Sequence, residues 1–364
     1  MMMPIRSIAG SLLLAATLGL VACGGASDVA TPDSPTAEET AAAPAAAELT
    51  PVKFTLSWLF QAVDAPLAIA LEKGYFAEEG LDVTYERGFG SADSITKIAA
   101  GQYDIGEGDM YSMIEFNEQN PDNQLVAVAV KYNRSPFAIV TKADSDFDTP
   151  ATLEGANLAA PAGDGPRRLW PVLAKEVGAA PDSVEWTNVE PQLRESLLAQ
   201  GNADGISCFS ISCLPVLHQK LGLPPEDLNV FYYNDHGLDL YGNALIVRKD
   251  FLEENPEVVQ SFVAAYLRGL KEALADPDAA LEVVTEMADD ELFDVAIESE
   301  RMAIAVERLY TSPEVDTMGL GGVDPDRLAA TIDQVVEGFG LASTPSVEEV
   351  FDGSALPPQE ERML

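Results

Sequence analysis

The chain has 364 residues, more than one hydrophobic core usually organises, so its length favours two compact lobes. It carries 60 acidic and 21 basic residues, a formal net charge of -39 at pH 7. This balance argues against nucleic acid as a partner, because phosphate backbones are bound by clusters of lysine and arginine. Solubility or adaptation to high salt explains the acidic excess most simply, and the charge of any ligand stays open.

The first residues predict an export signal. Arg6 is followed by an apolar run from Ile8 to Ala22, too short to span a bilayer comfortably. The run ends in Leu20-Val21-Ala22-Cys23-Gly24, which resembles the bacterial lipobox, in which the cysteine is acylated. We therefore expect a signal peptide at 1–22 and lipidation of Cys23, with an ordinary signal peptide as the alternative. A thioether-linked diacylglycerol and an amide-linked acyl chain would tether the protein stably to a membrane.

Residues 23–50 are expected to form a disordered tether, because they are small, polar and interrupted by proline. The folded part would then be anchored to a membrane by lipid alone, since no later segment has eighteen uninterrupted apolar residues. Cys208 and Cys213 are the remaining cysteines, and a disulfide and two free thiols are equally compatible with their spacing. The two histidines, His218 and His236, are too few for a credible metal site, and no cofactor is expected.

The first elements alternate between strand and helix. Residues 52–58 alternate apolar and polar side chains like a strand, and a loop leads to a helix that Asp64 can cap, with Pro66 in its first turn. Gly74 ends that helix, and residues 81–85 form the next strand. A helix ending at Gly101, a short strand after it and the buried strand "QLVAVAV" continue the α/β pattern.

An internal repeat indicates two similar lobes. "IAAGQYDIG" at 98–106 and "LAQGNADGI" at 198–206 are offset by one hundred residues, which aligns Gly101 with Gly201 and Asp104 with Asp204. Each copy predicts a helix that ends at glycine and a strand that begins near the aspartate. A chance match between such common residue types is the alternative.

Two apolar strands, 137–144 and 241–250, bracket the second lobe. If they run side by side, the chain leaves the first lobe there, builds the second and returns, and the two strands are the hinge. The expected boundaries are 51–140 and 243–364 for the first lobe and 141–242 for the second. After residue 250 the spacing of apolar residues predicts packing helices.

The ordered set of motifs resembles a known family. "APLAIALEKGYFAEEGLDV", "AAGQYDIG", "TLEGANLAAP", "LLAQGNADGI" and "GGVDPDRLAATIDQVVEGFG" are similar to segments of the periplasmic binding proteins of ABC importers for nitrate, sulfonate, taurine and thiamine-pyrimidine precursors. The resemblance covers residues 52–353. It implies a type II periplasmic-binding-protein fold, in which two α/β lobes joined by a two-strand hinge close over a small solute.

The resemblance also implies ligand-binding loops beyond the carboxyl ends of the strands. In the first lobe these would present Trp58, whose ring can stack on a solute, with Gln61, Asp64, Glu107 and Asp109. Trp58 could instead belong to the core, and the two acidic residues after the second strand could lie on a surface loop.

In the second lobe, "APAGDGPRRLW" places Asp164 and the pair Arg167 and Arg168 where a helix begins. An anion site and an ordinary ion pair to a nearby carboxylate are equally compatible with the two arginines. Phe209 follows the next strand, and Asp239 and Tyr241 precede the return to the first lobe; all three are further candidates.

The function implied is that of an exported, lipid-anchored solute-binding protein, not an enzyme, on the periplasmic face of a bacterial membrane. Its partners would be a small solute, a permease and an ATPase, with the chain itself a monomer. A sensing lipoprotein on the same fold is the alternative. A third reading, a synthase of the thiamine pyrimidine, is disfavoured because "SCFSISC" lacks that enzyme's histidine and clustered cysteines.

Overall fold

The structure is a computed structural model that describes residues 49–288 and 293–364. The expected signal peptide, Cys23 and the tether up to residue 48 lie outside the described residues. Residues 47–364 form one unit, which holds two five-stranded sheets. Among the described residues, none of the helices is both long enough and apolar enough to span a bilayer.

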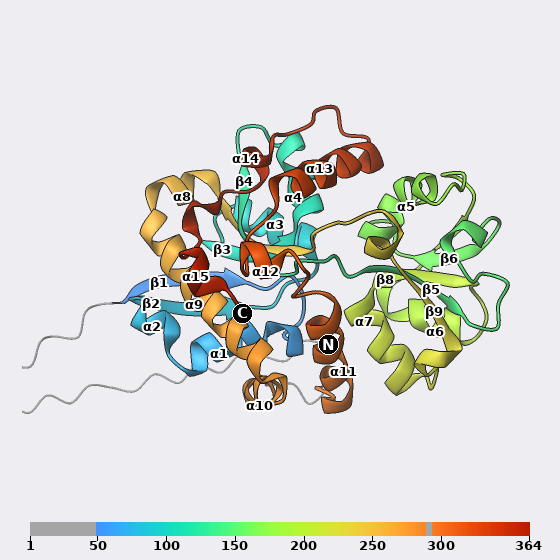
Figure 1. Ribbon diagram of the computed structural model, residues 1–364, viewed down its shortest axis with the longest axis horizontal. Helices are drawn as coiled ribbons and strands as arrows, with labels where there is room; N and C mark the ends of the chain where they lie inside the picture. Colours follow the sequence, from blue (N-terminus) through green and yellow to red (C-terminus); the bar gives the residue numbers. More distant parts are fainter. Residues whose placement is uncertain (1–48, 289–292) are drawn as a thin grey trace, which may run out of the picture. The chain divides into compact units, whose positions relative to one another are not determined.

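The first sheet has the strand order β2-β1-β3-β10-β4, and the second has the order β7-β6-β8-β5-β9. The strands of the first sheet are β1 (Thr50–Thr55), β2 (Leu81–Glu86), β3 (Ile105–Asp109), β4 (Leu125–Val130) and β10 (Asn243–Arg248). Those of the second are β5 (Phe137–Lys142), β6 (Asn157–Ala160), β7 (Glu185–Asn188), β8 (Gly205–Phe209) and β9 (Leu228–Tyr232). In each sheet the fourth strand is antiparallel to its neighbours, so the two lobes share one topology (Figure 1).

Helices follow the strands in both lobes and then fill the C-terminal third. The longer helices are α1 (Ala65–Glu72), α3 (Ser91–Ala99), α4 (Met110–Gln119), α5 (Gly165–Glu176), α9 (Pro256–Ala275), α10 (Pro277–Met287), α11 (Val295–Arg308) and α13 (Pro325–Phe339). The shorter ones are α2 (Tyr75–Glu78), α6 (Arg194–Ala199), α7 (Ser210–Pro215), α8 (Lys249–Glu254), α12 (Val315–Met318), α14 (Val347–Val350) and α15 (Gln359–Arg362). The predicted α/β alternation and the helical C-terminal part are confirmed.

The hundred-residue repeat has a structural basis. Asp104 accepts a hydrogen bond from the backbone N–H of Lys53 at 2.9 Å, and Asp204 accepts one from the N–H of Asn157 at 2.8 Å. Each aspartate therefore ties the start of β3 or β8 to the neighbouring strand, β1 or β6. The repeat marks equivalent positions in two similar lobes, as the sequence predicted.

The two apolar strands that were expected to form the hinge lie in different sheets. β5 pairs with β8 and β9, whereas β10 pairs with β3 and β4. Both strands are almost wholly buried, and a central place between two neighbours satisfies the backbone hydrogen bonds of such a strand. The prediction that these strands run side by side is wrong.

The chain crosses between the sheets in the segments that adjoin these strands, 131–136 and 233–242. These crossing segments do run together: Gly242 N–H donates to Tyr132 C=O at 2.9 Å, and Ser135 N–H donates to Leu240 C=O at 2.9 Å. A Cβ at position 242 would lie 2.8 Å from the Cβ of Tyr132, so only glycine permits this approach. The crossing segments, and not the strands, make the double connection.

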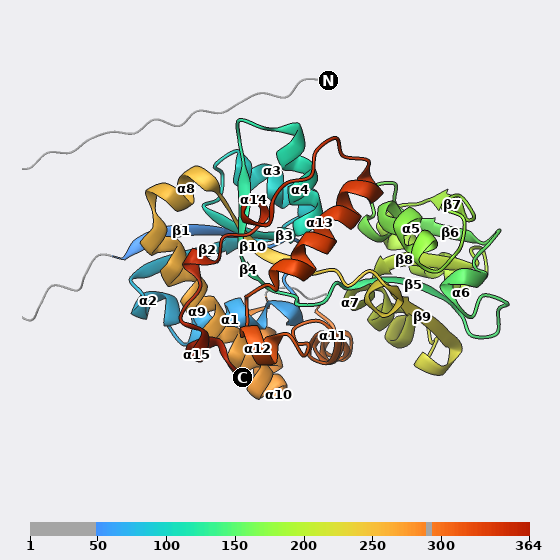
Figure 2. The same cartoon turned by 45° about the horizontal axis from the view of Figure 1, so that its top comes forward.

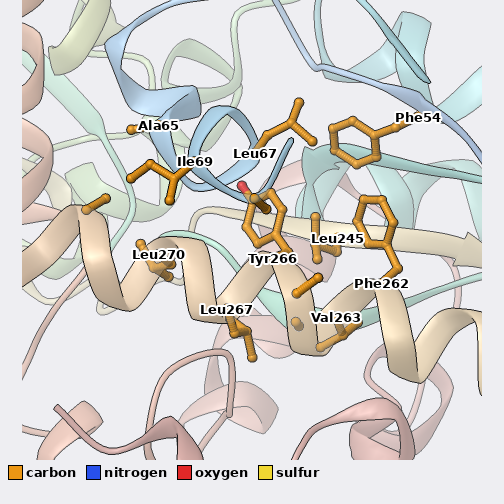
Figure 3. Packing of buried hydrophobic residues seen from close by; sticks show 14 of the residues in the cluster. Phe54, Ala65, Leu67, Ile69, Leu245, Phe262, Val263, Tyr266, Leu267 and Leu270 are labelled. Atoms are coloured by element: carbon orange, nitrogen blue, oxygen red, sulfur yellow. The ribbon is translucent and has the colours of Figure 1, made fainter. Parts of the chain in front are cut away.

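The first lobe is held by an aromatic core between β1 and α9. The rings of Phe54 and Phe262 stack with centroids 5.2 Å apart, and Tyr266 packs beside them (Figure 3). Leu67 of α1 and Leu245 of β10 complete this part of the core, and all five residues are at most 1% exposed. Burial of one such side chain contributes roughly 1.5–3 kcal/mol, so this core fixes the sheet edge that carries the loops described below.

Helix α13 links the two lobes a third time. Its predicted place is in the first lobe, but its apolar side chains Leu328, Ile332 and Val335 belong to a buried cluster that also contains Leu169 and Trp170 of α5. Figure 2 shows that α13 runs toward α5, on which it packs. α14, which follows it, packs on β4 of the first sheet. The C-terminal part of the chain therefore contacts the second lobe before it returns to the first.

Candidate functional site

A cavity of about 480 Å³ lies where the loops after the strands of both sheets converge. Its lining comes from the loop after β1, the starts of α3 and α4, the crossing segment, the starts of α5, α6 and α7, and the end of α13. This volume falls within the range of small-molecule sites. The carboxyl ends of strands in open α/β sheets are the positions where such sites form.

The loop after β1 brings Trp58 and Gln61 to the cavity. Trp58 is 36% exposed, so it is not a core residue. Its loop is held by the segment after β2, because Gly88 N–H donates to Trp58 C=O at 2.8 Å. A Cβ at Gly88 would lie 2.2 Å from the carbonyl oxygen of Leu56, so glycine is required for this contact. The tryptophan is thus presented to the cavity by a fixed loop.

A buried lysine, Lys131, lines the cavity from the first crossing segment. Lys131 Nζ lies 2.7 Å from Asp64 Oδ1 and 2.8 Å from Glu107 Oε1, and all three side chains are at most 5% exposed. Tyr266 donates to Glu107 at 3.1 Å. Burial lowers the pKa of Lys131, but the two carboxylates outweigh burial and hold this pKa well above its usual value. The ammonium stays charged and is already paired.

The sequence predicted that the Asp64 side chain caps α1, and this prediction is wrong. Its Oδ2 accepts from the backbone N–H of Gln61 at 2.9 Å and its Oδ1 pairs with Lys131, so neither oxygen reaches the N–H groups of the helix. The pull of the lysine, which lies 67 positions away in the sequence, overrides the local preference. Pro66 lies in the first turn of α1 as expected.

Asp109 lines the cavity and caps α4. It accepts from the Ser112 N–H at 2.7 Å and from the Ser112 hydroxyl at 2.9 Å. Burial raises its pKa, although the bonds from Ser112 act in the opposite direction. A pKa raised in the folded state means that the folded protein binds the proton more tightly, so the free energy of unfolding falls as the pH rises through that pKa.

Replacing Asp109 by asparagine should therefore remove this fall in stability with rising pH. Asparagine keeps the cap but carries no charge to bury, so the melting temperature of Asp109→Asn, taken relative to that of the natural protein, should rise as the pH is raised above the ordinary pKa of an aspartate. Asp109→Ala loses the helix cap, which should lower the free energy of unfolding by about 1 kcal/mol at every pH tested. Thermal melts at several pH values check this, and parallel pH curves for natural protein and Asp109→Asn would contradict it.

On the second lobe, Asp164 occupies the predicted position. It caps α5 by accepting from the Arg167 N–H at 3.2 Å, and it also binds the hydroxyl of Ser207. Burial raises its pKa, which Arg194, 3.7 Å away, acts to lower. Arg194 is itself paired with Glu195 at 2.7 Å. The second wall of the cavity thus holds one cation between two carboxylates.

The two arginines at the start of α5 point to different places. Arg168 lines the cavity and forms two hydrogen bonds to the carboxylate of Glu115, at 2.6 and 2.7 Å. Arg167 does not line it; its guanidinium donates to Ala160 C=O at 3.0 Å and to Asn188 Oδ1 at 3.3 Å. Of the two readings that the sequence left open, an ion pair to a carboxylate describes Arg168.

A disulfide shapes the loop at the end of β8. Cys208 and Cys213 are bonded to each other, which resolves the choice that their spacing left open. The residues between them include Phe209, Ile211 and Ser212, and all three line the cavity. The bond closes a short loop and so restricts the positions that these side chains can take.

Asn243, which lines the cavity, has a side-chain acceptor that is not used within the described residues. The residue is 4% exposed, and its Nδ2 donates to the hydroxyl of Ser57 at 3.0 Å. Within residues 49–288 and 293–364, its Oδ1 has no hydrogen-bond partner. A buried polar atom without a partner costs free energy, so this carbonyl oxygen is suited to accept a hydrogen bond from a ligand.

The structure brings most of the predicted site residues together. Those that line the cavity are Trp58, Gln61, Asp64, Asp109, Asp164 and Phe209. Glu107 lies one contact behind it, on Lys131. Arg167, Asp239 and Tyr241 do not line it: the Asp239 carboxylate is largely exposed and pairs with Arg327, and the buried Tyr241 hydroxyl donates to Glu314 at 2.8 Å.

Several cavity residues were not predicted. Lys131 begins the first crossing segment, Asn243 follows the second, Arg194 begins α6, and Phe89 and Phe339 come from segments without a binding motif. The helix start after β7 could have been inferred from the repeat, because Ser91 occupies the equivalent helix start of the first lobe. Lys131 carried no local signal, since a charged residue after an apolar strand usually lies on a surface loop.

The cavity is lined by more acidic than basic side chains. Five carboxylates and three cationic side chains line it, and each of the cations Lys131, Arg168 and Arg194 is paired with a carboxylate. The aromatic residues Trp58 and Phe89 are partly exposed. Within the described parts of the chain, no cluster of three histidine, cysteine or carboxylate side chains has the arrangement of a metal site. The cavity therefore offers apolar ring faces beside polar and charged groups that are already paired.

Comparison with known proteins identifies related chains. The family model described as "NMT1/THI5 like" matches residues 61–280. A formylaminopyrimidine-binding protein of Halalkalibacterium halodurans is 28% identical over 71% of this chain and 77% of its own length. The riboflavin-binding protein RibY of Chloroflexus aurantiacus is 24% identical over 90% of this chain and 92% of its own.

Two further likenesses bear on fold and activity. A 4-amino-5-hydroxymethyl-2-methylpyrimidine phosphate synthase of Saccharomyces cerevisiae is 25% identical over 62% of this chain and 68% of its own length. Among solved structures, the periplasmic aliphatic sulphonate binding protein SsuA of Escherichia coli has a TM-score of 0.64 at 14% identity, covering 83% of this chain and 92% of its own. The predicted periplasmic-binding-protein fold is confirmed.

Proposed function

The chain belongs to the NMT1/THI5-like family, and from that premise we propose that it is the solute-binding component of an ABC importer. It captures a small organic solute in the cavity between its lobes and presents it to a permease served by an ATPase. The observation that carries this proposal is the cavity itself, whose lining comes from both lobes. Ligand contacts on both sides favour the closed arrangement of such lobes and so couple binding to closure.

The chemistry of the cavity favours a flat, uncharged or cationic heteroaromatic solute over a sulfonate or nitrate. A bound anion needs a free cation, whereas Lys131, Arg168 and Arg194 already have carboxylate partners. Trp58 and Phe209 offer apolar faces, and Asn243 Oδ1 offers an acceptor for a ring N–H or an amino group.

The positions of the two histidines support a binding protein and not the alternative, a synthase. His218 pairs with Glu300, and His236 packs against the ring of Phe231; neither lines the cavity. Cys208 and Cys213 are bonded to each other. The residues that face the cavity therefore offer stacking and hydrogen bonding, and the solute leaves unchanged.

A thermal-shift screen tests the proposed function. The probes are formylaminopyrimidine, riboflavin, taurine, an aliphatic sulfonate and nitrate, each at several concentrations. A heteroaromatic probe at 100 times its Kd should add about 2.7 kcal/mol to the free energy of unfolding, and the anions should add nothing. A shift with sulfonate or nitrate alone would overturn the proposed solute class, and a folded protein that responds to no member of a widened panel would favour the sensing alternative.

Asn243→Leu tests the recognition of the solute. Leucine has a similar shape but no acceptor, so the affinity for the heteroaromatic probe should fall about tenfold, the value of one lost hydrogen bond to a buried partner. Ser57→Ala is the matched control, because it removes only the group to which the Asn243 amide donates and keeps Oδ1. Calorimetric titration measures both. An unchanged affinity in Asn243→Leu would show that Oδ1 does not contact the solute.

The proposal includes a lipid anchor on Cys23, which lies outside the described residues. Cys23→Ala should move the protein from the membrane fraction to the soluble fraction of a bacterial host, because two acyl chains hold a protein stably on a bilayer. The unmodified variant should also lack the added mass of the lipid. Equal membrane fractions for both proteins would contradict lipidation at this residue.

A further inference from the structure

A contact across the cavity joins the two lobes through Arg168. The guanidinium lies 3.8 Å above the ring of Phe339 and forms two hydrogen bonds to Glu115. Stacking on an aromatic face fixes the plane of an arginine, and the two parallel hydrogen bonds then match a carboxylate in both position and direction. The arrangement is therefore specific in geometry as well as in charge.

The partners of Arg168 come from different lobes. Glu115 lies in α4, which follows β3 of the first sheet, and Arg168 lies in α5, which follows β6 of the second. Both side chains are partly exposed, at 25% and 29%, and Arg168 and Phe339 line the cavity. The ion pair thus stands at the solvent-exposed rim of the cavity, where the lobes meet.

Helix α13 extends from the crossing segments to this contact, so the contact lies one helix length away from them. At its start, Arg327 donates to Asn133 C=O at 2.7 Å and to Asp239 C=O at 3.0 Å, one acceptor in each crossing segment. Phe339 ends the helix twelve residues later, about 18 Å along its axis. A rotation of about 10° at the crossing segments would displace a point about 18 Å away by about 3 Å, enough to break a hydrogen bond.

We propose that Arg168 and Glu115 form a latch that holds the two lobes closed over the cavity, with Phe339 positioning the arginine. The pair breaks when the lobes separate and forms again on closure, so it slows the escape of a bound solute. Its role in solute retention rests on the proposed function, whereas its role in holding the lobes together does not.

Small-angle X-ray scattering of the protein without solute tests the latch alone. Arg168→Glu places two carboxylates against each other and should increase the radius of gyration, and the charge swap Arg168→Glu with Glu115→Arg should restore the natural value. Arg167→Glu is the matched control, because the neighbouring arginine contacts only residues of its own lobe and should leave the radius unchanged. An unchanged radius in Arg168→Glu, with the melting curve showing a folded protein, would overturn the latch.

The rate of solute release provides a second readout. In stopped-flow experiments with formylaminopyrimidine, followed by tryptophan fluorescence, Arg168→Gln should dissociate about tenfold faster while the association rate stays within twofold. The charge swap should restore slow release. A change in the association rate alone would contradict a latch. If none of the heteroaromatic probes binds the natural protein, the proposed solute class fails, and the scattering result still decides the latch.

Discussion

Replacing Lys131 by methionine should lower the free energy of unfolding by about 3–5 kcal/mol. The ammonium is 1% exposed and is the shared partner of Asp64 and Glu107. Without it, two buried carboxylates face each other with no cation between them. Burial raises the pKa of Glu107, which Lys131 acts to lower, so loss of the lysine should raise this pKa further and make the variant more stable on acidification.

Chemical denaturation at pH 5 and pH 8 measures this effect. Lys73→Met is the control, because Lys73 forms a solvent-exposed pair with Glu272 and its loss should change the free energy of unfolding far less than the loss of Lys131. Adding Glu107→Gln to Lys131→Met removes the second charge and should recover part of the loss. A Lys131→Met protein as stable as Lys73→Met would show that the buried triad is not a structural unit.

Replacing Arg301 by methionine should lower the free energy of unfolding by about 3 kcal/mol or more. Arg301 is 4% exposed, and its Nε donates to Glu298 Oε2 at 3.0 Å. Its guanidinium also donates to the carbonyl of Ile211, in α7 of the second lobe. Among the described residues, the variant leaves the buried Glu298 carboxylate with the Ala62 N–H as its one remaining donor, at 2.8 Å, and the Ile211 carbonyl loses its bond from the arginine.

Arg308→Met in the same helix is the control for this change. Arg308 pairs with Asp235 at the surface, and its loss should cost at most about 1 kcal/mol. Denaturant unfolding compares the two variants. Equal costs would contradict the view that α11 fastens the first lobe to α7 through a buried arginine.

The sequence predicted the elements whose signals are local. Gly74 and Gly80 end successive helical segments in the left-handed region, and the apolar alternation of residues 81–85 becomes β2. The repeat around Asp104 and Asp204 was readable because the same side chain makes the same backbone contact in each lobe. Family resemblance then placed these elements in the correct fold.

The site was less predictable because its contacts join distant segments. Arg167 and Arg168 are identical in sequence terms, and only the packing of α5 turns the second toward Glu115 and the cavity. Asp64 was assigned to a helix cap by its position, but Lys131 holds it instead. The hinge prediction failed similarly, because an apolar strand does not indicate which of two sheets contains it.

The most direct test that the solute binds in this cavity is a calorimetric titration. The solute found in the screen is titrated into the natural protein and into Trp58→Ala. Trp186→Ala is the matched control, because Trp186 packs against Arg167 outside the cavity lining. We expect the natural protein and Trp186→Ala to bind one solute per chain with equal affinity, and Trp58→Ala to bind about fivefold more weakly, since stacking on one ring is worth about 1 kcal/mol. Equal affinity in all three proteins would place the solute elsewhere and contradict the account.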